Sequence, residues 1–170
     1  MKKRVVVFVV LAVLLAASTY AQTTRYFVYV ANNGSNKVSA YTISPSTGAL
    51  LPVSGSPFPA GAGTWNIAVD PTAKFLYVVN RDSNNISAYA INSSTGALIA
   101  INGSPFRVGS DPSAAAEPTG KFLYVDNTNS NNVSAYAINS STGALTAVCG
   151  SPFPAGTSPY GVVIATGTGP

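Results

Sequence analysis

One pattern occurs three times in this chain, and it constrains the fold more than any other feature. Residues 27–30, Phe-Val-Tyr-Val, recur as the related runs 75–78 and 122–125, at offsets of 48 and 47 residues. Self-similarity at a fixed period of this size is the signature of a repeat architecture. Three further motifs keep the same spacing, and their first copies lie at residues 38–41, 48–50 and 55–58.

Each copy contains four strand-sized segments, which in the second copy lie at residues 65–69, 74–79, 86–91 and 97–101. The second of these is apolar on both faces, with Phe75, Tyr77 and Val79 on one side and Leu76 and Val78 on the other. A short run of this kind, rich in aromatic and β-branched residues, is typical of a strand covered on both sides. We therefore expect Phe75 and Tyr77 to be buried, together with their counterparts Phe122 and Tyr124.

The connecting segments carry turn chemistry. Asp70-Pro71 and Glu117-Pro118 place an acidic residue and a proline at the first two positions of a type I turn, and we expect both turns to be exposed. Residues 93–96 end in a glycine that can adopt a positive φ in a hairpin loop. Turns at these intervals predict antiparallel strands and leave no room for helices within the repeats.

The predicted fold class is all-β. Four-stranded antiparallel sheets with a period in the mid-forties are typical of β-propeller blades. Three repeats, at about residues 25–73, 74–120 and 121–167, would form an open partial propeller spanning residues 22–170. Because the first copy starts at the second strand of a blade, we expect an unpaired innermost strand at residues 160–164. We interpret the abrupt end of the last repeat as a fragment of a longer propeller, the alternative being a short subunit that assembles.

The first 21 residues form a separate segment. Lys2, Lys3 and Arg4 precede 13 consecutive apolar residues, and small residues follow up to Ala21. This layout predicts a helical secretory signal peptide cleaved near Ala21, because the apolar run is shorter than the roughly 20 residues of a transmembrane helix. An uncleaved anchor is the alternative. We therefore expect a secreted or periplasmic protein with no stable membrane span after cleavage.

The charge of the chain excludes one class of partner. Removing residues 1–21 leaves six Lys and Arg residues against five Asp and Glu residues. Nucleic acid binding needs several clustered basic residues, so we expect no nucleic acid partner. The single cysteine, Cys149, can form no internal disulfide. We expect no metal site and no cofactor, since the chain has no histidine and no ligand cluster.

The repeat motifs resemble those of the lactonase-type β-propellers, which include phosphogluconolactonase-like and Tyr-Val-Thr-Asn repeat proteins. In the second copy the resemblance rests on residues 77–80, 85–89, 95–98 and 103–106. It covers about residues 25–163 and implies a propeller that usually has seven blades, in a family of which some members hydrolyse sugar lactones. This chain departs from that pattern, because it has three repeats and no histidine, and no catalytic residue transfers to it.

Four residues are candidates for contacting a ligand. Arg81 and Asp82 replace a neutral pair in the equivalent turn of the first copy, where a solvated turn with an incidental ion pair is the preferred interpretation and a polar site is the alternative. Asp126 replaces an apolar residue near a strand end, and Trp65, aligned with Pro112, could stack on a sugar or pack between blades. Asp111 is interpreted as a turn former.

Two classes of function follow. The first is a non-catalytic exported repeat module that binds a protein or carbohydrate ligand, or self-associates through exposed blade edges. The alternative is a lactone hydrolase of the 6-phosphogluconolactonase-like type, a carboxylic ester hydrolase. Lactone opening needs a positioned base or metal-bound water, and without histidine the usual activation of serine has no base. The catalytic residues of such an enzyme are not identifiable from the sequence, which favours the binding module.

Overall fold

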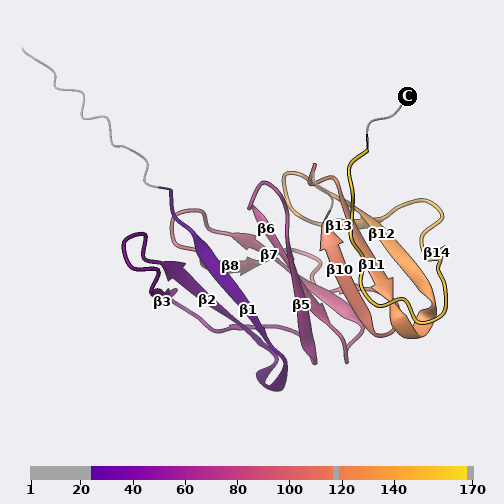
Figure 1. Ribbon diagram of the computed structural model, residues 1–170, viewed down its shortest axis with the longest axis horizontal. Coiled ribbons are helices and arrows are strands. Elements are labelled where there is room, and N and C mark those ends of the chain that lie inside the picture. The colour runs from indigo at the N-terminus through magenta and orange to yellow at the C-terminus, as the bar shows by residue number, and fades with distance from the viewer. Residues whose placement is uncertain (1–23, 117–118, 168–170) are drawn as a thin grey trace, which may run out of the picture.

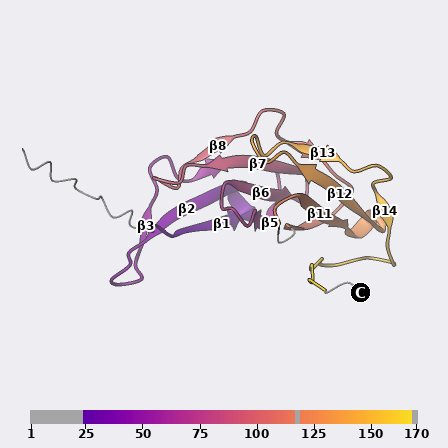
Figure 2. The same cartoon turned by 90° about the horizontal axis from the view of Figure 1, so that it is seen from above.

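The computed structural model describes residues 24–116 and 119–167. They form three antiparallel sheets placed side by side in an arc, each from one copy of the repeat (Figures 1 and 2). The predicted signal peptide and the turn at Glu117 lie outside the described residues. In the part of the chain that is described, the only helical elements are two short 3₁₀ turns, η1 (Asn33–Ser35) and η2 (Thr128–Ser130).

The strands follow the predicted order. The first sheet contains β1 (Phe27–Asn32), β2 (Lys37–Ile43), β3 (Leu50–Pro52) and β4 (Phe58–Pro59). The second contains β5 (Thr64–Val69), β6 (Phe75–Asn80), β7 (Asn85–Ile91), β8 (Leu98–Ala100) and β9 (Phe106–Arg107). The third contains β10 (Pro112–Ala116), β11 (Phe122–Asn127), β12 (Asn132–Ile138), β13 (Leu145–Ala147) and β14 (Phe153–Pro154). The all-β propeller prediction is confirmed.

The outermost strand of each sheet is divided into two short pieces that pair with the same neighbour. In the second sheet, β8 and β9 both pair with β7, and the Gly-Ser-Pro motif lies between them. The Ser104 hydroxyl accepts a 2.9 Å hydrogen bond from the Ala88 N–H and so replaces a ladder acceptor at the break. Ser56 and Ser151 do the same in the other sheets, also at 2.9 Å. The recurring motif is therefore a device for turning the outer strand.

The core lies between the sheets. Leu76 and Val78 on one face of β6 pack toward the first sheet, and Tyr77 and Val79 on the other face pack toward the third. All four side chains are fully buried. Complete burial of a large apolar side chain contributes about 1.5–3 kcal/mol, so these interfaces hold the sheets together. The predicted two-sided covering of this strand is confirmed.

Hydrogen bonds between sheets repeat along the arc. The Tyr29 hydroxyl donates to the Gly96 carbonyl oxygen at 2.9 Å, and Tyr77 donates to Gly143 in the same way. A Cβ on Gly143 would lie 2.4 Å from the Phe75 ring, so only glycine permits this approach. A bond also runs from a later sheet to an earlier one, since the Tyr136 hydroxyl in β12 donates to the Arg107 carbonyl oxygen in β9 at 2.7 Å.

Three expectations from the sequence are wrong in detail. Phe122 and Tyr124 are only half-buried, because they face the end of the arc where no further sheet packs among the described residues. The Asp70-Pro71 turn is exposed at residues 71–74 as expected, but Asp70 itself is 4% exposed, because its carboxylate accepts hydrogen bonds from the Lys74 and Phe75 N–H groups. Residues 160–164 form no strand, since no strand of the described chain lies in position to pair with them.

Candidate functional site

A polar hollow of about 570 Å³ lies where the loops of all three sheets meet. It receives residues from the β1–β2 connection, the β6–β7 connection, the segment before β10 and η2. Its lining consists of Asn33, Trp65, Arg81, Asp82, Asn84, Ser110, Asp111 and Asn129. Three of the four candidate residues, Trp65, Arg81 and Asp82, therefore lie in one place.

Trp65 reaches the hollow because of a β-bulge. Thr64 pairs with Asn80, and Asn66 pairs with the next residue, Val79, so Trp65 is an additional residue in β5. In the third sheet, Pro112 and Ser113 pair with consecutive residues, so the position of Trp65 has no counterpart there. Bulges redirect side chains and are frequent beside functional sites. The alignment of Trp65 with Pro112 is therefore wrong, and the Trp65 side chain is 45% exposed.

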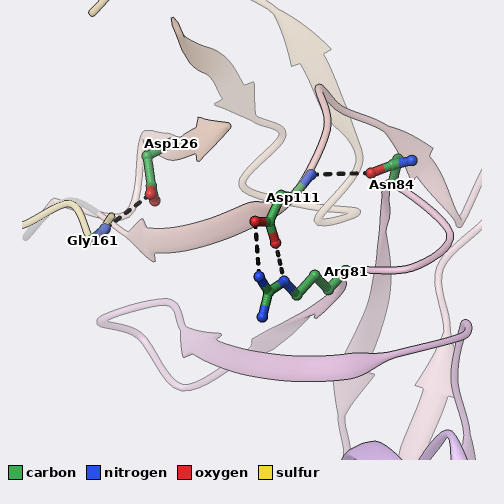
Figure 3. A network of polar contacts seen from close by, with 5 residues as sticks. All are labelled: Arg81, Asn84, Asp111, Asp126 and Gly161. Carbon is green, nitrogen blue, oxygen red and sulfur yellow. Dashed lines mark hydrogen bonds and ion pairs between the residues drawn. The ribbon is translucent and has the colours of Figure 1, made fainter. Parts of the chain in front are cut away.

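Arg81 forms the main electrostatic contact of the site. Its Nε and Nη2 atoms donate to the two carboxylate oxygens of Asp111, with 2.8 Å between Nη2 and Oδ2 (Figure 3). Two parallel charge-assisted bonds fix the plane of the guanidinium group. The expected ion pair within the turn, between Arg81 and Asp82, does not form. The carboxylate that pairs with Arg81 is that of Asp111, which directly precedes β10 of the third sheet.

The backbone around Asp111 holds this geometry. Asp111 has a φ of 58°, and its N–H donates to the Asn84 side-chain oxygen at 3.1 Å (Figure 3). In the same way, the Gly63 N–H donates to the Asn36 side-chain oxygen at 2.9 Å, and the Ser158 N–H donates to the Asn131 side-chain oxygen at 2.7 Å. Asp111 is thus a turn former, as expected, and it is also the carboxylate partner of Arg81.

The guanidinium carbon of Arg81 lies 4.9 Å from the centre of the Trp65 ring. A cation at this distance is attracted by the ring quadrupole, so the ion pair also positions the indole. Asp82 is exposed beside them and packs against Gly63. A Cβ on Gly63 would lie 2.5 Å from the Asp82 carboxyl carbon, and Gly63 has a φ of 67°.

Asp126 lies apart from this hollow. It is 1% exposed, and its Oδ2 atom accepts a 2.9 Å hydrogen bond from the Gly161 N–H (Figure 3). Within residues 24–116 and 119–167, its Oδ1 atom has no hydrogen-bond partner. The structure therefore places Asp126 as an anchor for residues 158–164, and the Trp65–Arg81 hollow does not include it.

Neither a metal centre nor a spanning helix is found in residues 24–116 and 119–167. In this part of the chain, no three His, Cys, Asp or Glu residues are grouped so that they could hold a metal ion. No helix within these ranges is long and apolar enough to cross a membrane.

Comparison with known families identifies the fold. The model of the lactonase family, the seven-bladed β-propellers, matches residues 27–158. The chain belongs to this family. No curated protein sequence matches the chain as a relative.

Solved structures of lactonase-like propellers superpose on this family member. A candidate 6-phosphogluconolactonase from Bacteroides uniformis is 26% identical with a TM-score of 0.70, and the match covers 78% of this chain and 38% of that one. A candidate 6-phosphogluconolactonase from Bacteroides fragilis is 22% identical with a TM-score of 0.71, covering 78% and 37%. The periplasmic gluconolactonase of Pseudomonas aeruginosa is 22% identical with a TM-score of 0.68, covering 77% and 37%. The chain thus spans well under half the length of these structures.

Proposed function

We propose that this member of the lactonase family is a non-catalytic binding module for polyhydroxylated, carbohydrate-like ligands, and that the Trp65–Arg81 hollow is its site. The observation that carries the proposal is the fixed Trp65–Arg81–Asp111 arrangement at the meeting point of three sheets. An indole face with polar groups around it suits a sugar ring, which has apolar C–H faces and hydroxyl edges.

Hydrogen-bond capacity remains for such a ligand. A guanidinium group has five N–H donors, and Asp111 takes two of those of Arg81. Asp82, Asn33 and Asn129 contribute acceptors and amide donors around the same hollow. Because Asp111 balances the charge of Arg81 and Asp82 adds a second carboxylate to the lining, the site favours neutral ligands.

The same arrangement disfavours turnover. Opening a lactone requires a base to activate water and donors to stabilise the oxyanion. Asp111 is held by Arg81, and the other carboxylate lining the hollow is Asp82. The chain contains no histidine.

The second candidate function is lactone hydrolysis, which the names of the solved relatives favour. In that case Asp82 would serve as the base, since its carboxylate is exposed in the hollow. Turnover lost in Asp82→Asn would separate this function from simple binding.

The single tryptophan of the chain lies in the proposed site and provides the test. Titration with gluconate, 6-phosphogluconate or glucose should produce a saturable change in Trp65 emission for at least one compound. Arg81→Ala should abolish the change. Arg107→Ala is the matched control, because the Arg107 side chain is exposed on β9 outside the hollow. A flat titration with all three compounds, or equal responses of the two variants, would remove the basis of the proposal.

We also propose that the protein is exported, on the basis of the basic and apolar segments before Ala21. Mass spectrometry of the protein recovered from its producing cells should show an N-terminus at Gln22 or within a few residues of it. Intact Met1 on protein from the cytoplasmic fraction would contradict export.

A further inference from the structure

The turns that follow β1, β6 and β11 contain positions that repeat and positions that differ. Asparagine is the last residue of all three strands, and serine and asparagine occupy the last two turn positions in every copy. The two positions between them carry Asn33-Gly34 in the first copy, Arg81-Asp82 in the second and Thr128-Asn129 in the third. A position that serves the common fold keeps its residue type in each copy, so the two variable positions are the ones available for a ligand.

The repeated residues of these turns hold the backbone in place. The asparagine that ends the strand donates to a serine of the next strand at 2.8 to 2.9 Å in all three copies. The side-chain oxygen of the asparagine that ends the turn accepts an N–H from the segment after the sheet at 2.7 to 3.1 Å. The variable positions, in contrast, contribute Asn33, Arg81, Asp82 and Asn129 to the lining of the hollow. The fold thus fixes the turns and leaves these side chains to contact a ligand.

Asp82 supplies the unused acceptors of the hollow. In residues 24–116 and 119–167 its carboxylate takes part in no ion pair and no hydrogen bond, whereas Arg81 is paired with Asp111 (Figure 3). Asp82 is also exposed to solvent. An ionised carboxylate has two oxygens that only accept hydrogen bonds. Asp82 therefore offers two neighbouring acceptors and one uncompensated negative charge.

The backbone places this carboxylate near Trp65. Gly63 lies directly before β5 and two residues before Trp65, and a Cβ on Gly63 would lie 2.7 Å from Oδ2 of Asp82. Only glycine therefore leaves room for the Asp82 side chain at this point. Trp65 leaves the strand at the bulge and keeps 45% of its surface exposed. A pair of acceptors and an apolar aromatic face thus lie at the same end of β5.

On the basis of the binding function proposed above, we propose that Asp82 determines the specificity of the hollow by accepting hydrogen bonds from two adjacent hydroxyl groups of a neutral sugar ring. The C–H face of the ring lies on Trp65. Hydrogen bonds to an ionised acceptor are roughly twice as strong as those between neutral groups. The same charge disfavours a ligand carboxylate, because like charges placed together cost free energy. The ligand class is neutral pyranoses with vicinal hydroxyls, and the corresponding sugar acids are rejected.

Titration of Trp65 emission with glucose and with glucuronate, which differ only at C6, tests this role. The wild-type chain should bind glucose about tenfold more tightly than glucuronate. Asp82→Asn should weaken glucose binding by about fivefold, because the charge and one acceptor oxygen are lost. The preference for glucose over glucuronate should fall to about twofold or less in this variant, because the like-charge repulsion is removed.

Two controls separate local contact from folding and from overall charge. Asparagine suits this turn, because Asn129 occupies the equivalent position in the third sheet, and an unchanged urea midpoint verifies folding. If the midpoint falls, Asp82→Gly, which copies Gly34 of the first sheet, replaces Asp82→Asn with the same expected losses. Ser141→Lys, at an exposed loop position outside the hollow, changes the net charge equally and should keep the wild-type preference.

Three results would overturn this role of Asp82. If Asp82→Asn keeps the wild-type glucose affinity and preference, the binding function stands and Asp82 does not set its specificity. Equal changes in Asp82→Asn and Ser141→Lys would assign the preference to overall charge. A wild-type chain that responds to neither glucose nor glucuronate would also overturn it, and its response to gluconate and 6-phosphogluconate then decides separately whether the binding function survives.

Discussion

The Tyr77 hydroxyl lies 2.9 Å from the carbonyl oxygen of Gly143 and donates a buried hydrogen bond to it. The two residues are 66 positions apart, and the bond joins the middle of one sheet to the loop of the next. It explains why the tyrosine and the glycine recur together in the repeat. The second copy supplies both partners, since Tyr77 donates to the third sheet and Gly96 accepts from Tyr29 of the first.

This relationship predicts unequal effects of one substitution at equivalent positions. Tyr77→Phe should lower the free energy of unfolding by about 1–2 kcal/mol, because the Gly143 carbonyl loses its partner in a buried setting. Tyr77→Ala should cost roughly 3–5 kcal/mol, as for other buried aromatic truncations. Tyr124→Phe is the matched control and should cost much less in the monomer. Equal losses for the two Phe variants, measured by urea unfolding, would show that the hydroxyl bond is unimportant.

The divided outer strand yields a second prediction. Ser104→Ala should destabilise the chain by about 1–2 kcal/mol, because the Ala88 N–H loses its acceptor at the break between β8 and β9. Ser141→Ala, at an exposed loop position, should have little effect. Thermal or urea unfolding of the two variants measures the difference. No difference between them would mean that water replaces the serine hydroxyl without cost.

A third prediction concerns alkaline pH. Burial raises the pKa of the Tyr29 phenol from 10.0 to about 12. Between these values the unfolded chain has released the proton and the folded chain has kept it, so stability falls as pH rises. The contribution is fully present below about pH 10 and is lost by about pH 12.

Urea midpoints measured across this range should therefore decline less steeply for Tyr29→Phe than for wild type. Tyr26→Phe, which alters a 61% exposed residue, should follow the wild-type curve. The assignment to Tyr29 would be wrong if both variants declined alike.

The ion pair supports a fourth prediction. Asp111→Asn should weaken ligand binding by about tenfold, because Arg81 loses its bidentate partner and its fixed position over Trp65. Titration of Trp65 emission measures this effect. Asp70→Asn is not a suitable comparison, because Asp70 holds its own turn, so Arg107→Ala again serves as the control. Unchanged affinity would show that Arg81 does not need Asp111.

The sequence predicted the features that repeat and missed those that occur once. Three copies of the tyrosine, serine and glycine motifs were sufficient to predict the sheets, because the same contacts form in each copy. The bulge at Trp65 occurs in one copy only, so alignment by motif placed Trp65 opposite Pro112. The contact between Arg81 and Asp111 spans 30 positions and two sheets, and residue spacing alone does not reveal it. In the structure Asp111 takes the place of Gly63, since both have a positive φ and donate to an asparagine side chain, whereas alignment by motif set Asp111 opposite Thr64.

Hydrolysis of D-glucono-1,5-lactone, followed in a pH-stat, distinguishes binding without turnover from catalysis. The measurement uses the purified chain, with the lactone at a concentration that saturates the change in Trp65 emission. We expect a rate of acid release equal to that of buffer alone, in wild type and in Asp82→Asn. A rate above the buffer value that survives further purification and disappears in Asp82→Asn or Arg81→Ala would contradict it and establish a lactone hydrolase.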